Sequence, residues 1–188
     1  FRNNFYQCKL YHRNNYVYLH NCMDILYHAL TGITIAKSMD SPYPFGAAVA
    51  AMLPDVIGII PFYTIKFMEA TRAPRDTFIK TYSRLLLSNT FANTIDTTAY
   101  RATHSLYVAA VFTLGMFVFL KDQWLVLSLS YLSHILIDIP THEGDFATRI
   151  FFPSSDFHVQ GVNWSTHPKR FFFFWVALGL IIFWLWQT

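Results

Sequence analysis

The chain has 188 residues, of which 54% are apolar and 19% aromatic, whereas only 13% are charged. This length allows one domain, and apolar residues gathered in long blocks are typical of a polytopic membrane protein rather than a soluble domain. The net charge of +3 gives no compositional support for nucleic-acid binding. The two cysteines, Cys8 and Cys22, match no zinc-finger or redox spacing.

The first 22 residues differ in character from the rest. They contain no methionine, and the first methionine, Met23, stands directly before the first apolar block. They also lack the apolar core and small-residue cleavage site of a secretory signal. We therefore treat residues 1–22 as an N-terminal extension whose place in the native protein the sequence leaves open, and we expect residues 23–188 to form one membrane-embedded helical domain.

The apolar blocks predict an all-α fold, a polytopic transmembrane bundle of about five helices. The expected spans are, in chain order, Asp24–Ala36, Phe45–Phe62, Ser105–Leu120, Gln123–Ile139 and Phe171–Trp186. Pro54-Asp55 is expected to interrupt the second span. Between the second and third spans, Asp76–Leu87 has apolar residues at helical spacing, which indicates an amphipathic helix. It can lie at the membrane interface or pack against the bundle.

The basic residues orient this threading. If the five spans cross in turn, every lysine and arginine except Lys37 and Lys121 falls on the side of the N-terminus. Positive charge concentrates on the cytoplasmic side of membrane proteins. We therefore expect an inner or cytoplasmic membrane protein whose N-terminal segment and loops 63–104 and 140–170 face the cytoplasm.

The clearest chemical pattern lies near the end of the fourth span. His134 and Asp138 are four residues apart, so a helix places both on one face. A neutral imidazole and a carboxylate on adjacent turns can share a divalent metal ion, and an ionisable pair in an apolar run indicates a function. The alternative is a buried His–Asp hydrogen bond that only joins helices.

Three more polar residues fall in the same half of the membrane when the five spans cross it in turn. They are His28, Asp55 and His104. A histidine such as His28, taken alone, is more often a core residue than a ligand. A carboxylate such as Asp55 inside a membrane helix usually faces a watery cavity. Because five unrelated core residues would scatter between the two halves, we expect these three to join His134 and Asp138 in one metal site.

Several neighbouring residues leave alternatives open. Gly32 can clear space for a metal or permit close helix packing. Thr103 can cap the third span, which would make Arg101 an ordinary interfacial charge; otherwise Arg101 can meet an anionic oxygen. In the loop after Asp138, each of three side chains can add a ligand, act as general base or be solvated: His142, Glu143 and Asp145. His158 and His167 have no assigned role.

Three histidines and two aspartates suit zinc or a mixed or two-metal centre, and such ligands also admit manganese or iron. A metal of this kind lowers the pKa of bound water to about 7, which favours hydrolysis. We therefore expect a divalent metal cofactor, and zinc is the first candidate.

These motifs together resemble a known family. The series is His28, Leu53-Pro54-Asp55, Arg101-Ala102-Thr103-His104-Ser105 and Ser133-His134-Ile135-Leu136-Ile137-Asp138. In order and rough spacing, from Met23 to about Pro153, it is similar to the YdjM-like, or LexA-binding, inner-membrane metal-dependent hydrolases, which are themselves thought similar to zinc-dependent phospholipase C. The resemblance implies an all-helical metal site, hydrolysis of a phosphoester, and His28, Asp55, His104, His134 and Asp138 as ligands. That family commonly has histidine where this chain has Tyr100, so one possible ligand is missing here.

Taken together, the sequence predicts an integral-membrane hydrolase that acts on a phosphoester or lipid-like substrate at the cytoplasmic face. Its expected catalytic residues are Glu143 or Asp145 for proton transfer and Arg101 for developing negative charge. The main alternative is a non-catalytic membrane scaffold, in which the His/Asp cluster is a structural tie and the apolar last span contacts membrane-protein partners. A proton or ion transporter using Asp55 is weaker, because the polar residues offer no path across the other half of the membrane.

Overall fold

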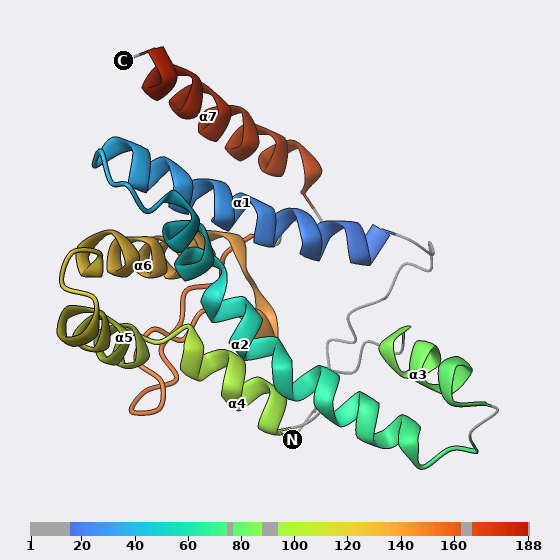
Figure 1. Cartoon of the computed structure of the whole chain (residues 1–188). Helices are drawn as coiled ribbons and strands as arrows, with labels where there is room; N and C mark the ends of the chain where they lie inside the picture. The colour runs from blue at the N-terminus through green and yellow to red at the C-terminus, as the bar shows by residue number, and fades with distance from the viewer. Residues whose placement is uncertain (1–15, 75–76, 88–93, 163–166, 188) are drawn as a thin grey trace.

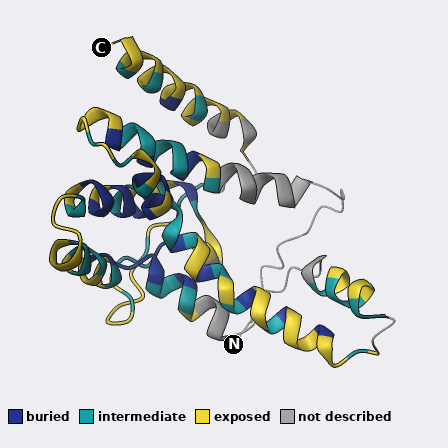
Figure 2. Cartoon of the chain, in the orientation of Figure 1, coloured by how far each residue is buried: buried dark blue, intermediate teal, exposed yellow. Residues whose placement is uncertain are grey.

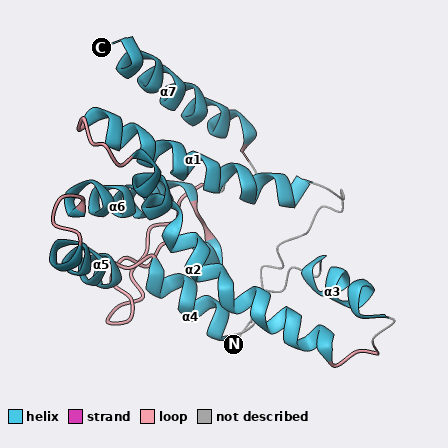
Figure 3. Ribbon diagram, viewed as in Figure 1, coloured by secondary structure: helices cyan, strands magenta, loops and turns pink. Residues whose placement is uncertain are grey.

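The computed structural model describes residues 16–74, 77–87, 94–162 and 167–187 (Figure 1). Within these ranges all regular secondary structure is helical (Figure 3), as the sequence predicted. The elements are α1 (Tyr16–Ser38), α2 (Pro44–Thr71), α3 (Phe78–Leu87), α4 (Thr94–Thr103), α5 (Leu106–Phe119), α6 (Trp124–Thr141), the 3-10 turn η2 (Gly144–Phe146) and α7 (Pro168–Gln187). The boundary expected after residue 22 falls inside α1, and residues 1–15 lie outside the described ranges.

Helix α2 lies at the centre of the bundle. It contacts α1, α3, α4 and α6, while α5 packs on α6 and α7 packs on α1. Short turns join α1 to α2 and α5 to α6, so each pair is antiparallel. In Figure 1, α1, α5 and α7 run in one direction and α2 and α6 in the other. This arrangement brings together the middle of α2, the last turns of α6 and the end of α4.

Small residues allow the helices around α2 to approach closely. Ala36, Ala47 and Ala50 are buried together with Val126 and Leu127 of α6. A Cβ added at Gly32 of α1 would lie 2.3 Å from the carbonyl oxygen of Ala47, a distance that no side chain can occupy. Of the two roles considered for Gly32, the structure therefore supports close helix packing.

The expected interruption of the second span is wrong. Helix α2 runs without a break from Pro44 to Thr71, with Pro54 and Pro61 inside it. An internal proline removes one helix hydrogen bond and strains the preceding turn, but α2 is packed on several sides, and this burial outweighs the local loss. The helix also extends well past Phe62, the expected end of the span.

The region between the second and third spans contains two helices, of which the sequence predicted one. In α3, Phe78 and Tyr82 pack on Phe67 of α2, with ring centroids 5.7 Å and 6.2 Å away. The apolar side of α3 thus packs against the bundle, as one of the two alternatives expected. Helix α4 was not predicted, because its polar sequence has little apolar periodicity and its helical form depends on packing against α2.

The start of α5 corrects another expectation. Its N-cap is Ser105, whose hydroxyl accepts a hydrogen bond from the amide of Val108. Thr103 does not cap this helix; its hydroxyl donates to the carbonyl of Tyr100 within α4. The reason is that α4 continues through Thr103, which leaves only the short break at His104 and Ser105 before α5 begins.

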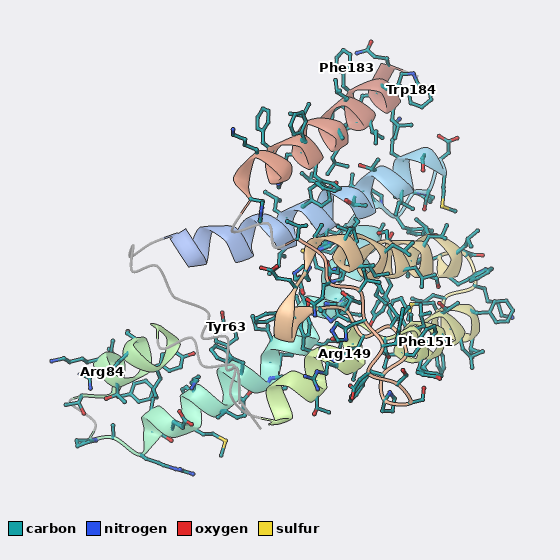
Figure 4. All side chains as sticks on the ribbon, turned by 180° about the vertical axis from the view of Figure 1, so that it is seen from behind. Tyr63, Arg84, Arg149, Phe151, Phe183 and Trp184 are labelled. Atoms are coloured by element: carbon teal, nitrogen blue, oxygen red, sulfur yellow. The ribbon has the colours of Figure 1, made fainter. Side chains whose placement is uncertain are left out.

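Many positions along α2, α5 and α7 are exposed (Figure 2). Exposed apolar side chains line α2, α5 and α7, and in Figure 4 Phe183 and Trp184 project from the outer end of α7. In the described ranges, α2 and α6 are long and apolar enough to cross a membrane, while Leu106–Phe119 and Phe172–Gln187 are shorter apolar helical segments. The structure thus contains two candidate spans, and the five-span bundle stays a prediction.

Candidate metal centre

Four separate helical segments bring the five predicted ligands together. His28 comes from α1, Asp55 from α2, His104 from the break after α4, and His134 and Asp138 from α6. The three imidazoles are fully buried, Asp138 is 1% exposed and Asp55 18% exposed at the side chain. The predicted convergence of these groups is therefore observed for Asp55, His104, His134 and Asp138, and His28 lies beside Asp138.

Asp55, His104, His134 and Asp138 form a group that can hold a metal ion, with one ligand atom from each residue and all four atoms within 4.8 Å of one another. The Nε2 atoms of His104 and His134 are 3.0 Å apart. The Oδ2 atom of Asp138 lies 3.2 Å from the first and 3.1 Å from the second. The Oδ1 atom of Asp55 lies 3.4 Å and 3.6 Å from the same two nitrogens.

These separations fit a shared cation. In a tetrahedral zinc site with bonds of about 2.0–2.1 Å, neighbouring ligand atoms are ~3.3 Å apart. The observed separations of 3.0–3.6 Å scatter around that value. The donor set is imidazole nitrogen and carboxylate oxygen, which zinc, manganese and iron all accept.

Backbone carbonyls fix the tautomers of two histidines. Nδ1 of His134 donates to the carbonyl oxygen of Ala51 at 2.6 Å, and Nδ1 of His104 donates to the carbonyl oxygen of Tyr100 at 2.8 Å. A carbonyl only accepts, so the proton of each neutral ring is on Nδ1 and the lone pair of Nε2 faces the cluster. This is the usual arrangement of metal-ligating histidines.

Asp138 is the centre of the cluster. Its two oxygens are buried and, within the described residues, accept no hydrogen bond of acceptable geometry. Oδ2 faces His104 and His134, while Oδ1 lies 3.2 Å from Nε2 of His28 and 3.5 Å from Nδ1 of His142. Buried acceptors without a donor call for an explanation such as a bound ion. The two edges of the carboxylate thus face two separate pairs of imidazoles.

Aromatic contacts hold the rings in place. The ring of Tyr100 stacks on His104 with centroids 3.9 Å apart, and the ring of His28 stacks on His134 at 3.8 Å. The hydroxyl of Tyr131 donates to the carbonyl of Thr103 at 2.6 Å, which ties α6 to the end of α4. The ring of Tyr100 therefore supports a candidate ligand.

The predicted catalytic residues lie around this cluster without a contact that assigns their roles. Arg101 is half-buried on α4, and its Nε is buried without a hydrogen bond among the described residues. Glu143 is exposed just before η2. Asp145 lies in η2, and its side chain is outside the described part of the structure. The roles of all three residues stay predictions, whereas His142 reaches Asp138 itself.

The residues that sequence reasoning missed act through their backbone. The carbonyls of Ala51 and Tyr100 orient two ligands, and the extended stretch at Gly161-Val162 pairs with His142 and Pro140 through amide-to-carbonyl bonds of 2.9 Å each. Carbonyl positions depend on how helices pack, and no residue type marks them in the sequence. Only the stacking residue Tyr100 was noted, as a departure from a family motif.

The pKa of His104 gives the cluster a pH dependence. Burial lowers this pKa, but the carboxylates of Asp138 and Asp55 beside the ring raise it above its ordinary value against the opposing effect of His134. In the metal-free protein, the attraction between protonated His104 and the two carboxylates stabilises the fold. This stabilisation is complete below about pH 6.5 and disappears as pH rises through the raised pKa of His104. We expect the chelator-treated protein to be less stable toward urea at pH 8 than at pH 6. The metal-loaded protein should instead lose its metal on acidification, because protons compete for the ligands.

The fold and the site define an all-helical protein with a buried His/Asp group able to hold a metal. Known proteins add nothing to this description: no protein-family model, no curated protein and no solved structure matches the chain.

Proposed function

We propose that this chain is an integral-membrane, metal-dependent hydrolase that acts on a phosphoester or lipid-like substrate at the cytoplasmic face. The observation that supports metal binding is the convergence of ligand atoms: when both rings are neutral, the lone pairs of two Nε2 atoms face each other and two carboxylates. A divalent cation shared by these atoms makes that arrangement favourable. A bound divalent metal supplies a Lewis acid and an activated water.

The membrane location is supported by the surface of the helices. Besides the two candidate spans α2 and α6, exposed apolar residues continue over α5 and α7, among them Val111 and Leu180. Contiguous apolar surfaces this extensive are uncommon on soluble monomers. The excess of lysine and arginine in loops 63–104 and 140–170 supports a cytoplasmic site. Lipids and membrane proteins are therefore the proposed partners.

The two edges of Asp138 support a centre with two ions. Asp55, His104 and His134 would hold one ion together with Oδ2, and His28 and His142 would hold the other together with Oδ1. A carboxylate shared in this way is a common feature of hydrolytic two-metal sites, whose ions are ~3.5–4 Å apart. In such a site the chain's own Arg101 and Glu143 would meet the charge and the proton of the reacting phosphoester.

Elemental analysis of the detergent-purified chain tests this proposal. We expect two equivalents of a divalent metal, with zinc as the first candidate, and hydrolysis of a phosphoester lipid that stops when the metal is removed by a chelator. A metal-free protein that takes up no zinc, manganese or iron on titration would rule the proposal out.

Replacing His28 tests the second position. We expect His28→Ala to keep one equivalent of metal and lose the other, because Nε2 of His28 faces Oδ1 of Asp138, the oxygen assigned to the second ion. Metal-to-protein ratios from elemental analysis distinguish the outcomes. A wild-type protein with one equivalent, unchanged in His28→Ala, would show that the second position does not exist.

A further inference from the structure

Gly58 lies at a close contact between two helices and is near a candidate ligand in the sequence. Gly58 of α2 is buried one turn after Asp55. A Cβ built on Gly58 would lie 3.0 Å from Oγ1 of Thr103 and 3.2 Å from Cα of Tyr100. Both atoms belong to α4, the helix that ends at Thr103, directly before His104. The second is with backbone, which cannot move aside as a flexible side chain can.

The two residues that contact Gly58 are the two that hold His104. The carbonyl oxygen of Tyr100 and the hydroxyl oxygen of Thr103 lie 2.8 Å and 3.1 Å from Nδ1 of His104, and the Tyr100 ring stacks on the imidazole. A side chain at Gly58 that pushed α4 away would therefore also move Tyr100 and Thr103, the residues that hold the His104 ring. The distance between His104 Nε2 and Asp55 Oδ1, already 3.4 Å, spans the same α2–α4 interface.

We propose that Gly58 is a positioning residue for the metal centre: by letting α4 rest against α2, it sets the distance at which His104 and Asp55 face a common ion. This inference rests on the proposed metal-dependent function. Gly32 has a different role, because its contact is with the backbone of Ala47 in the interface that holds α1 against α2. A substitution at Gly32 should therefore lower the stability of the whole bundle.

The test compares glycine-to-alanine variants of the full chain in detergent, titrated with Zn²⁺ and with Co²⁺ as a spectroscopic probe. Gly58→Ala should weaken metal binding about 10- to 100-fold, the range seen when residues that support metal ligands are changed, and should shift the ligand-field bands of bound cobalt. Gly115→Ala and Gly179→Ala are matched controls, since a Cβ at either position meets nothing within 4 Å. Both should bind metal as the wild type does.

The outcomes separate this inference from the proposed function. A wild-type chain that binds neither ion defeats the proposed function and this inference with it. Wild-type binding combined with unchanged affinity and cobalt spectrum in Gly58→Ala defeats this inference alone. If Gly58→Ala does not fold, the pair Thr103→Ala and Gly58→Ala/Thr103→Ala replaces it, because the first change removes the nearest contact atom. The glycine substitution should still weaken binding in that background, and equal affinities would overturn the proposal.

Discussion

Asp138→Asn should abolish metal binding, with a loss of affinity of at least about 100-fold, and with it all hydrolytic activity. The substitution preserves the shape of the side chain but removes its charge and replaces one acceptor oxygen with a donor. Asp138 faces four imidazoles from its two oxygens, so the substitution affects both proposed metal positions. Losses of this size are expected when a ligand itself is changed, since supporting residues alone account for 10- to 100-fold.

Metal content after purification and dialysis is the measurement, with His134→Ala as a second ligand variant. Ser133→Ala is the matched control: Ser133 is adjacent on α6, and its hydroxyl donates to the carbonyl of Ser130. It should retain the wild-type metal content. Undiminished metal in both ligand variants would show that the cluster is not the binding site and that its contacts serve only to join the helices.

Val111→Arg should destabilise the protein in a bilayer by about 2.5–3.5 kcal/mol, the cost of an arginine near the centre of a membrane helix. Val111 lies in the middle of α5 and is 71% exposed, so in a membrane it would face lipid. Leu180→Arg in α7 should behave in the same way. If these helices instead faced water, an added surface charge would change the free energy of unfolding by less than about 0.5 kcal/mol.

The measurement is reversible unfolding in lipid bilayers, supported by the yield of membrane-inserted protein. Ile79→Arg is the control, because Ile79 is also highly exposed but lies on the short helix α3, next to Lys80 and Arg84. Figure 4 shows Arg84 pointing away from the bundle. Near-neutral effects at both Val111 and Leu180 would contradict the membrane-embedded arrangement of α5 and α7.

The pattern of apolar residues predicted the helices well where they are apolar and poorly where they are polar. The blocks in α5, α6 and α7 have few competing signals, so their ends were predicted within a few residues. Helix α4 escaped prediction, because a Thr-rich segment has weak intrinsic preference for a helix and needs a partner surface. Pro54 suggested a break in α2 that the packing of neighbouring helices prevents.

The sequence by itself determined which residues of one helix share a face. His134 and Asp138 are four residues apart, and the 3.6-residue period of the helix makes them neighbours wherever that helix lies. The same local rule cannot relate residues on different helices. That His104 comes from the break after an unpredicted helix, and that Asp55 comes from an unbroken one, are consequences of how α2, α4 and α6 pack.

Only the tertiary structure decided that these groups form a site able to hold a cation. The tautomers of His104 and His134 depend on the carbonyls of Tyr100 and Ala51, which have no signature in the residue types around them. The sharing of Asp138 between two pairs of imidazoles depends on the distances between α1, α2, α4 and α6. Sequence periodicity fixes directions within a helix, whereas coordination depends on distances between helices, and those arise only when the whole bundle is packed.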